Sequence, residues 1–345
     1  MACQEFDGQV VRLEQIRDLA EKFVRVRLTR IEHNDLNLFE FDYDLTFIVF
    51  FLSSDGKIYA RYGGRDAEGP DSRQSLAGLR YTMQSVLDMH GRQAKLFARR
   101  SRETPRYVGD LPGARHGGGC MHCHNVKELL NQELEKNGQW TRDSAWRYPP
   151  PENLGFELEV DRGNVIKAVP KESPASKAGL RPRDVVVELN GQPVHSFADT
   201  AFALDLAPSR GSIEIVWERD GKSSRAQLTL PAEWKKTDVT WRASMQHLIP
   251  TARLYGADLS DQEKLALGLS PKQLAFRQTD SVPAQVKAAG ILPGDIILGV
   301  EDKQFDADDI AFRHYIERNY LIGDRVTVNI LRGGQQLKLP MTLIR

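Results

Sequence analysis

The chain contains an internal repeat, which limits its possible folds more than any other feature of the sequence. Residues 178–186 read AGLRPRDVV and residues 289–297 read AGILPGDII. Further along, residues 217–221 read WERDG and residues 330–334 read ILRGG, at a similar separation of about 111 residues. Solenoid units are shorter than this, about 20–50 residues, so the period indicates a duplicated domain. The sequence therefore predicts two copies of one fold.

The two copies share one order of parts. Each has a Leu-Gly-apolar turn, a strand, an Ala-Gly segment, a second strand, a helix and a hairpin. The prolines at 149–151 exclude regular structure and mark the boundary before the first copy. We call residues 151–232 the first repeat and residues 233–345 the second repeat. The glycine turn consists of Leu154, Gly155 and Phe156 in the first repeat and of Leu267, Gly268 and Leu269 in the second.

The repeated pattern resembles bacterial PDZ domains, although Arg183 stands where those domains usually have glycine. The resemblance implies that each repeat binds the C-terminus of a protein or peptide. A glycine turn exposes backbone N–H groups that can bind a terminal carboxylate, and the following strand offers an edge to which a peptide can add. Helices near 197–204 and 308–316 complete the expected pockets. In the alternative, the repeats dock together and only brace the chain.

PDZ domains of this type accompany bacterial periplasmic serine proteases. The sequence contains no Gly-x-Ser-x-Gly elbow and no convincing order of Ser, His and Asp. We therefore expect no protease chemistry.

The N-terminal residues predict a small α/β domain. Residues 10–22 have the apolar spacing of a helix, and residues 23–31 alternate apolar and basic side chains as a strand does. Residues 46–52 and 57–62 flank an Asp-Gly pair, which predicts a hairpin. Residues 75–90 predict a second helix.

This order resembles a thioredoxin fold whose first strand is missing, over residues 1–92. Leu45 stands where thioredoxins have a cis-proline. Thioredoxins carry Cys-x-x-Cys at the start of the first helix, where the helix N-terminus lowers a thiol pKa. Cys3 lies near that place, while Phe6 occupies the second position. The resemblance makes Cys3 a candidate catalytic thiol.

Residues 93–150 form a predicted linker with a short helix at 125–137 and a Cys-x-x-Cys-His motif. The motif consists of Cys120, Cys123 and His124, the pattern that attaches c-type haem through two thioethers and one proximal histidine. In one alternative, the same residues hold zinc, with His116 or His122 as the fourth ligand. In another, the two thiols form a reducible disulfide.

Composition excludes some classes of protein. Lys and Arg number 47, and Asp and Glu also number 47, so overall charge does not favour nucleic acid. No run of 18 apolar residues is present, and the first residues are not a signal peptide.

The domain order resembles a planctomycete-type family of thioredoxin-like PDZ proteins that includes selenoproteins. An in-frame selenocysteine codon can make Met1 a false start, so we expect the natural protein to begin upstream, with an export signal.

The sequence thus predicts an exported α+β multidomain protein of the periplasm or cell envelope. A thioredoxin-like domain precedes two PDZ domains that bind protein or peptide C-termini. The expected function is redox or electron transfer with haem c. One alternative is a non-enzymatic PDZ scaffold that has a degenerate thioredoxin fold and a zinc or thiol site. A third hypothesis is a thiol oxidoreductase that uses Cys3.

Overall fold

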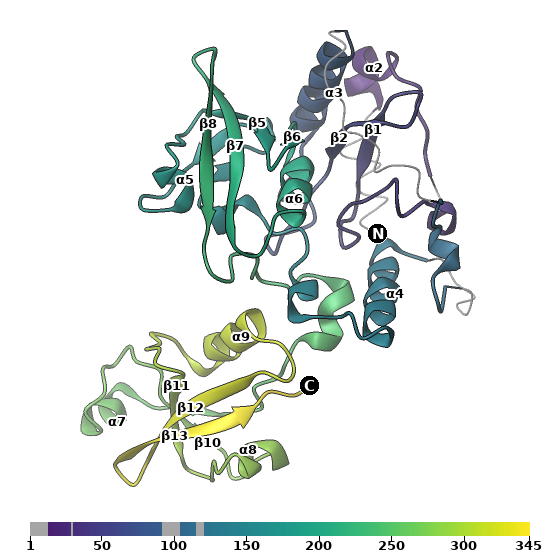
Figure 1. The fold of residues 1–345 in the computed structure, drawn as a ribbon. Helices are drawn as coiled ribbons and strands as arrows, with labels where there is room; N and C mark the ends of the chain where they lie inside the picture. The colour runs from purple at the N-terminus through teal and green to yellow at the C-terminus, as the bar shows by residue number, and fades with distance from the viewer. Residues whose placement is uncertain (1–12, 29, 92–103, 115–120) are drawn as a thin grey trace. The chain divides into compact units, whose positions relative to one another are not determined.

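The computed structural model of the protein describes residues 13–28, 30–91, 104–114 and 121–345. The chain forms two compact units (Figure 1). The first unit contains Met1–Thr237 and Trp241–Ser244, and the second contains Asp238–Thr240 and Met245–Arg345. The domain boundaries expected at 92, 150 and 232 remain a prediction.

The N-terminal part of the first unit is built on one hairpin. Strands β1 (Val49–Leu52) and β2 (Ile58–Tyr62) pair in antiparallel register, and Gly56 in the turn has a φ of 79°. Helices α2 (Leu13–Ala20) and α3 (Leu76–Gly91) supply apolar side chains to the same core. The predicted hairpin and both predicted helices are confirmed. The core contains Ile16, Leu19, Ala20, Phe51, Tyr59, Ala60, Tyr62, Leu79, Met83 and Val86.

The strand expected at residues 23–31 is wrong. In the described residues of this segment the chain forms no strand, and a short helix, η1 (Ile31–His33), follows. Val24 and Val26 are 94% and 77% exposed. Alternating side chains stabilise a strand only when one face is buried and a partner supplies hydrogen bonds, and here the apolar face has no cover.

The thioredoxin-like fold class is also wrong on structural grounds. A thioredoxin fold needs a central sheet with parallel as well as antiparallel neighbours, to which the hairpin would contribute two strands. In the described residues before the first repeat, the named strands are β1 and β2 alone, and they form a two-stranded antiparallel sheet. The hairpin and helix were predicted correctly, but they do not belong to that fold.

The segment before the first repeat packs on the loop that precedes β1. It contains η2 (Val108–Asp110), α4 (Cys123–Lys136) and η3 (Arg142–Ala145). Helix α4 confirms the short helix expected here. Its shared core with the preceding loop contains Phe41, Tyr43, Val108, Leu111 and Val126.

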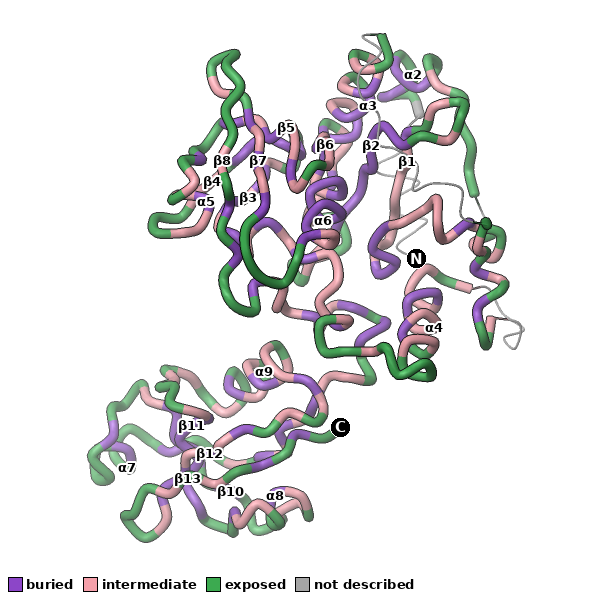
Figure 2. The backbone as a smooth tube through the Cα atoms, in the orientation of Figure 1, coloured by how far each residue is buried: buried purple, intermediate pink, exposed green. Residues whose placement is uncertain are grey.

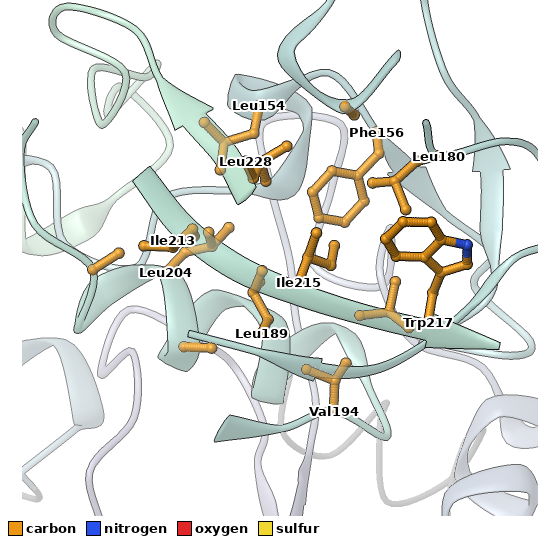
Figure 3. Close-up of a cluster of buried hydrophobic side chains, with 14 of the residues drawn as sticks. Leu154, Phe156, Leu180, Leu189, Val194, Leu204, Ile213, Ile215, Trp217 and Leu228 are labelled. Carbon is orange, nitrogen blue, oxygen red and sulfur yellow. The ribbon is translucent and has the colours of Figure 1, made fainter. Parts of the chain in front are cut away.

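The first repeat consists of two small sheets around one apolar core (Figure 3). Strands β3 and β4 pair with each other, and the other sheet has the order β6-β5-β7-β8. Leu154, Phe156 and Leu204 point into the core and are fully buried. The elements are η4 (Pro151–Leu154), β3 (Glu157–Leu158), β4 (Ile166–Ala168), α5 (Pro174–Lys177), β5 (Val185–Leu189), β6 (Gln192–Pro193), α6 (Phe197–Asp205), β7 (Gly211–Arg219) and β8 (Lys222–Leu230).

The second repeat has a similar element order, but helix α7 is inserted between its first two strands and no strand corresponds to β6. It forms one five-stranded antiparallel sheet, β13-β12-β11-β10-β9. Its core contains Leu254, Phe276, Phe312 and Ile316. The elements are η5 (Ala243–Leu248), β9 (Gly256–Asp258), α7 (Asp261–Ala266), β10 (Phe276–Gln278), α8 (Ala284–Ala288), β11 (Ile296–Val300), α9 (Asp309–Asn319), β12 (Arg325–Arg332) and β13 (Gln335–Thr342).

Both repeats contain the same bidentate ion pair. Arg219 donates from Nε and Nη2 to the two carboxylate oxygens of Asp184, at 2.7 Å each. Arg332 contacts Asp295 in the same way, at 2.8 and 2.7 Å. Each arginine also donates to the glycine carbonyl of the Ala-Gly motif, at Gly179 or Gly290. The pair fastens this turn to the hairpin strand and supports duplication of the whole fold.

Replacing the buried carboxylate should destabilise only its own repeat. We expect Asp295→Ala to lower the free energy of unfolding of the second unit by about 1.5–3 kcal/mol, since the Arg332 and Leu292 donors lose their acceptor. All five tryptophans lie in the first unit, at 140, 146, 217, 234 and 241. In urea, the unfolding transition of the second unit, followed by far-ultraviolet circular dichroism, should therefore move to lower urea. The transition followed by tryptophan fluorescence should not move. Asp184→Ala is the matched control and should shift the fluorescence transition.

Candidate peptide-binding site

The predicted turn of the first repeat is a tight turn at the end of η4. Gly155 has a φ of 80°, and a Cβ at this position would lie 2.2 Å from the Ser173 Cβ, so only glycine fits. The N–H of Gly155 donates to the carbonyl of Glu152 at 3.0 Å, and that of Phe156 donates to Pro151 at 3.4 Å. These two amides therefore already have acceptors within the repeat.

The turn of the second repeat lies at a different place from the one predicted. Strand β9 pairs with β10 as β3 pairs with β4, so the segment that matches the first turn is Leu254 and Tyr255. Leu254 is fully buried, as Leu154 is. The predicted residues Leu267, Gly268 and Leu269 instead follow α7, where Leu267 caps the helix and Gly268 has a φ of 74°.

Strand β9 is the edge strand of its sheet, and one side of its backbone faces outward. The N–H of Leu259 donates to Ala275, and the N–H of Thr279 donates to the carbonyl of Tyr255. Backbone groups of an antiparallel strand point alternately to its two sides. The N–H and C=O groups of Gly256 and Asp258 therefore face away from β10.

Helix α9 lies beside this free edge. The N–H of Asp309 donates to Oδ1 of Asp258 at 3.2 Å, and the Arg313 guanidinium lies 5.7 Å from the centre of the Tyr255 ring. Ile310, in the first turn of α9, is 53% exposed. Burial and the nearby carboxylate of Asp309 raise the pKa of Asp258. The edge thus combines outward-facing backbone groups, an aromatic ring, an aliphatic side chain and the Arg313 guanidinium, which is paired with Asp309 at 2.9 Å.

A shallow hollow adjoins the same strand. It is lined by Ala257, Asp258 and Leu259 of the edge, by Glu263 of α7, and by residues 277–280 at the end of β10 and just after it. The strand edge is therefore open on the sheet face as well as beside α9.

The Cys-x-x-Cys-His motif lies only partly in the described chain. Cys3, His116 and Cys120 fall outside the described residues. Cys123 is the first residue of α4, and Nδ1 of His124 lies 3.3 Å from Oε1 of Glu128 one turn later. The rings of His122 and His124 stack at 5.8 Å. Within the described ranges, no group of three His, Cys, Asp or Glu side chains could hold a metal ion.

A serine protease needs a serine hydroxyl bonded to a histidine ring. In the portion of the chain that the structure describes, the ring of His90 bonds to Tyr59 and that of His124 bonds to Glu128 and Asn125, and no histidine ring bonds to a serine. No helix within those same ranges is both long and apolar enough to cross a membrane.

Comparisons with known proteins identify a PDZ domain in the chain. The family model described as "PDZ domain" matches residues 165–219, within the first repeat. A "Probable periplasmic serine protease do/HhoA-like" of Haemophilus influenzae is 29% identical over 184 residues, which are 53% of this chain and 36% of that protein. The "Periplasmic serine endoprotease DegP" of Escherichia coli is 26% identical over 240 residues, which are 66% of this chain and 45% of that protein.

The chain spans less than half the length of these curated relatives. One solved structure, "HtrA-type protease AlgW with decapeptide", is 17% identical and covers 39% of this chain and 41% of its own. Its TM-score is 0.25, which is too low to support a conclusion about this fold.

The comparisons correct the predicted function. The relatives are serine endoproteases, so the redox and electron-transfer function, the scaffold alternative with a degenerate thioredoxin fold, and the oxidoreductase role of Cys3 are wrong. The predicted cofactors, haem c and its alternative zinc, are wrong as well. The relatives' names also run against our expectation that protease chemistry is absent. The predicted periplasmic location is confirmed.

Sequence reasoning missed the edge at Tyr255 and Gly256. A signal was present, since the sequence Leu254-Tyr255-Gly256 places apolar residues directly before a glycine, as Leu154-Gly155 does in the first repeat. A Leu-Gly pair marks a glycine turn and also the end of a helix, and the copy at Leu267 belongs to the second class. A strand order for the second repeat would have distinguished the two.

Proposed function

We propose that the chain is a periplasmic peptide-binding protein whose second repeat captures the C-terminal segment of a protein or peptide. The observation that carries this proposal is the outward-facing backbone of β9, at Gly256 and Asp258. A peptide strand that pairs there gains main-chain hydrogen bonds on one side and contacts α9 on the other. The PDZ match in the first repeat supports it, since the second repeat shares the order of strand pair, short helix, strand, long helix and hairpin, apart from the inserted helix α7 and the missing counterpart of β6.

The predicted roles of the glycine turns become a narrower proposal. We place the terminal carboxylate of the peptide at the turn formed by Leu254 and Tyr255, with the Arg313 guanidinium as a nearby positive charge. Leu267, Gly268 and Leu269 then stabilise the end of α7. The exposed face of Ile310 favours an apolar peptide side chain next to α9.

Removing one outward N–H should weaken binding. We expect Asp258→Pro to lower peptide affinity about tenfold, because proline has no N–H and its ring obstructs the added strand. Proline is tolerated on an edge strand where the N–H faces solvent. The measurement is fluorescence anisotropy with labelled decapeptides that end in Ala, Val, Leu or Phe.

Asp258→Ala is the matched control, since it removes the same carboxylate but keeps the backbone N–H. Its affinity should stay within about threefold of the original protein. Equal losses in both variants would contradict the proposal and assign the effect to the side chain. Circular dichroism melting checks that both variants fold.

A second candidate is proteolysis of bound peptides, and the serine endoprotease relatives favour it. The test is digestion of fluorescent casein, with labelling by a fluorophosphonate that reacts only with an activated serine. Serine labelling and cleavage together support this candidate. Casein that stays intact, with no labelled serine, contradicts it.

A further inference from the structure

Helix α6 of the first repeat is enclosed, whereas its counterpart α9 is not. Residues 198–204 of α6 are all buried, while in α9 only Phe312 and Ile316 are buried (Figure 2). A helix that is buried on every side must be covered by a second layer of protein. The cover over α6 is the N-terminal part of the same unit.

The edge of strand β2 binds the first turn of α6. The backbone N–H of Arg61 donates to Oδ1 of Asp199 at 2.8 Å, and the Ser196 hydroxyl donates to the carbonyl of Arg61. The Arg61 guanidinium lies 3.6 Å from the centre of the Phe202 ring. Two side chains of α6 thus replace the strand that would otherwise pair with β2.

The start of α3 binds the strand side of the same repeat. The Ser75 hydroxyl donates to Asp161 at 2.6 Å, and the Tyr81 hydroxyl donates to Oδ1 of buried Asn164 at 2.9 Å. A Cβ at Gly78 would lie 2.6 Å from the carbonyl oxygen of Val160. Helix α3 therefore touches the backbone just beyond β3, and only glycine permits this approach.

Arg73, just before α3, contacts both the start of α6 and η4 of the first repeat. Its guanidinium lies 5.0 Å from the centre of the Phe197 ring at the start of α6. It also forms 2.6 Å ion pairs with Glu152 of η4 and with Asp66. The side chain is 17% exposed, so the ion pairs are largely shielded from solvent.

The sequence of α6 matches this enclosure. Ser196 and Asp308 are the N-caps of α6 and α9, which aligns Ala201 with Arg313 and Phe202 with His314. At these two positions, and at Phe197 opposite Asp309, the open helix carries a charged or polar side chain and the covered helix an apolar one. Asp199, opposite Ala311, is the reverse case, and its carboxylate is used in the contact with Arg61. This difference is expected if α6 evolved against a permanent cover rather than water.

We propose that the first repeat does not capture free peptides, because its groove between β3 and α6 is closed in cis by Arg61 and by the segment from Arg73 to Tyr81. A peptide that adds a strand from Phe156 onward reaches Val160 within four residues, where α3 already lies. The amides of Gly155 and Phe156 are used by η4. The first repeat is then a docking module for its own N-terminal part. This inference concerns the first repeat and does not depend on the function proposed for the second.

Hydrogen exchange of the full chain without peptide tests the closure directly. In Gly78→Val the added side chain collides with Val160, so exchange at residues 157–161 and 197–205 should rise at least tenfold. Gly91→Val is the matched control, because Gly91 ends the same helix and a Cβ there meets open space. Its exchange at those residues should equal that of the original protein. Unchanged exchange in a folded Gly78→Val variant would overturn the proposal.

Photo-cross-linking tests the consequence for peptides. The probe is a pool of benzophenone-labelled decapeptides that end in Ala, Val, Leu or Phe. In the original protein, cross-links should map only to residues 254–259 and 309–319. Gly78→Val should add cross-links at 154–161 and 197–205. Cross-links to the first repeat of the original protein would refute closure, whereas no cross-link in the second repeat contradicts only its proposed function.

A milder variant covers the case in which Gly78→Val does not fold. Arg73→Ala combined with Ser75→Ala removes the contacts to Glu152, Phe197 and Asp161 without adding atoms. Exchange at 157–161 and 197–205 should again rise, by about threefold to tenfold. No rise in this folded double variant would equally overturn the proposal.

Discussion

Arg242→Ala should lower the free energy of unfolding of the first unit by about 3–5 kcal/mol, because it leaves buried carboxylates without their counter-charge. Nη1 of Arg242 lies 2.7 Å from Asp42 and 3.4 Å from Asp44. The three side chains are 3%, 9% and 0% exposed. Burial raises the pKa of Asp42, the Arg242 charge opposes this rise, and the nearby Asp44 carboxylate adds to it, so the loss of Arg242 leaves the charged form of Asp42 without its counter-charge.

Urea unfolding followed by tryptophan fluorescence measures this loss, since all five tryptophans lie in the first unit. Lys167→Ala is the matched control. Nζ of Lys167 lies 2.6 Å from Oε1 of Glu157, but the two side chains are 60% and 36% exposed. Exposed ion pairs contribute about 0–1 kcal/mol to the free energy of unfolding. If Arg242→Ala costs no more than Lys167→Ala, the buried cluster does not hold the unit together. Adding Asp42→Asn to Arg242→Ala should recover part of the loss.

The Arg242 cluster shows which interactions sequence patterns do not reveal. Ser244, whose hydroxyl donates to Asp44, lies 200 positions after Asp44 in the sequence. Periodicity describes only neighbours along the chain, so an ion pair at this distance leaves no mark in it. The docking of Arg61 onto Asp199 escaped prediction for the same reason.

Local structure was easier to predict. The hairpin around Gly56 and the helix predicted at 75–90, which is α3, were correct because an Asp-Gly turn and an amphipathic spacing act within a few residues. The repeat predicted the shared Asp184 and Asp295 positions, which the structure pairs with equivalent arginines. The thioredoxin assignment failed because the described residues of 23–31 form no strand and the hairpin strands β1 and β2 pair only with each other. Element order alone does not specify a sheet.

The candidate site was predicted in kind but not in place. A glycine turn before an edge strand was expected in each repeat, and the second repeat does have a free edge beside a helix. The sequence could not show that Leu267 ends a helix, nor that the first groove is covered. The covered helix did leave a trace at Ala201 and Phe202, which are unusually apolar beside Arg313 and His314.

Raising the pH from about 4 to about 7 should weaken the first unit through Asp199. Burial raises the pKa of Asp199 to about 7, although Arg61 and the backbone N–H groups of Arg61 and His195 oppose the rise. The unfolded carboxyl titrates near 3.8. Between these values the folded state binds more protons than the unfolded state, so each increase in pH favours unfolding. The stabilisation that protonated Asp199 contributes is fully present below about pH 4, and it is lost completely above about pH 7.

Asp199→Asn isolates this effect, because asparagine resembles the protonated acid and still accepts from the Arg61 N–H. The free energy of unfolding of the original protein minus that of the variant should fall by up to about 4 kcal/mol between pH 4 and 7, at about 1.4 kcal/mol per pKa unit. Above pH 7 the difference should stay constant. Urea unfolding by tryptophan fluorescence at pH 4.5, 5.5, 6.5 and 7.5 measures it. A difference that is flat, or that grows with pH, contradicts a neutral Asp199 at the contact between β2 and α6.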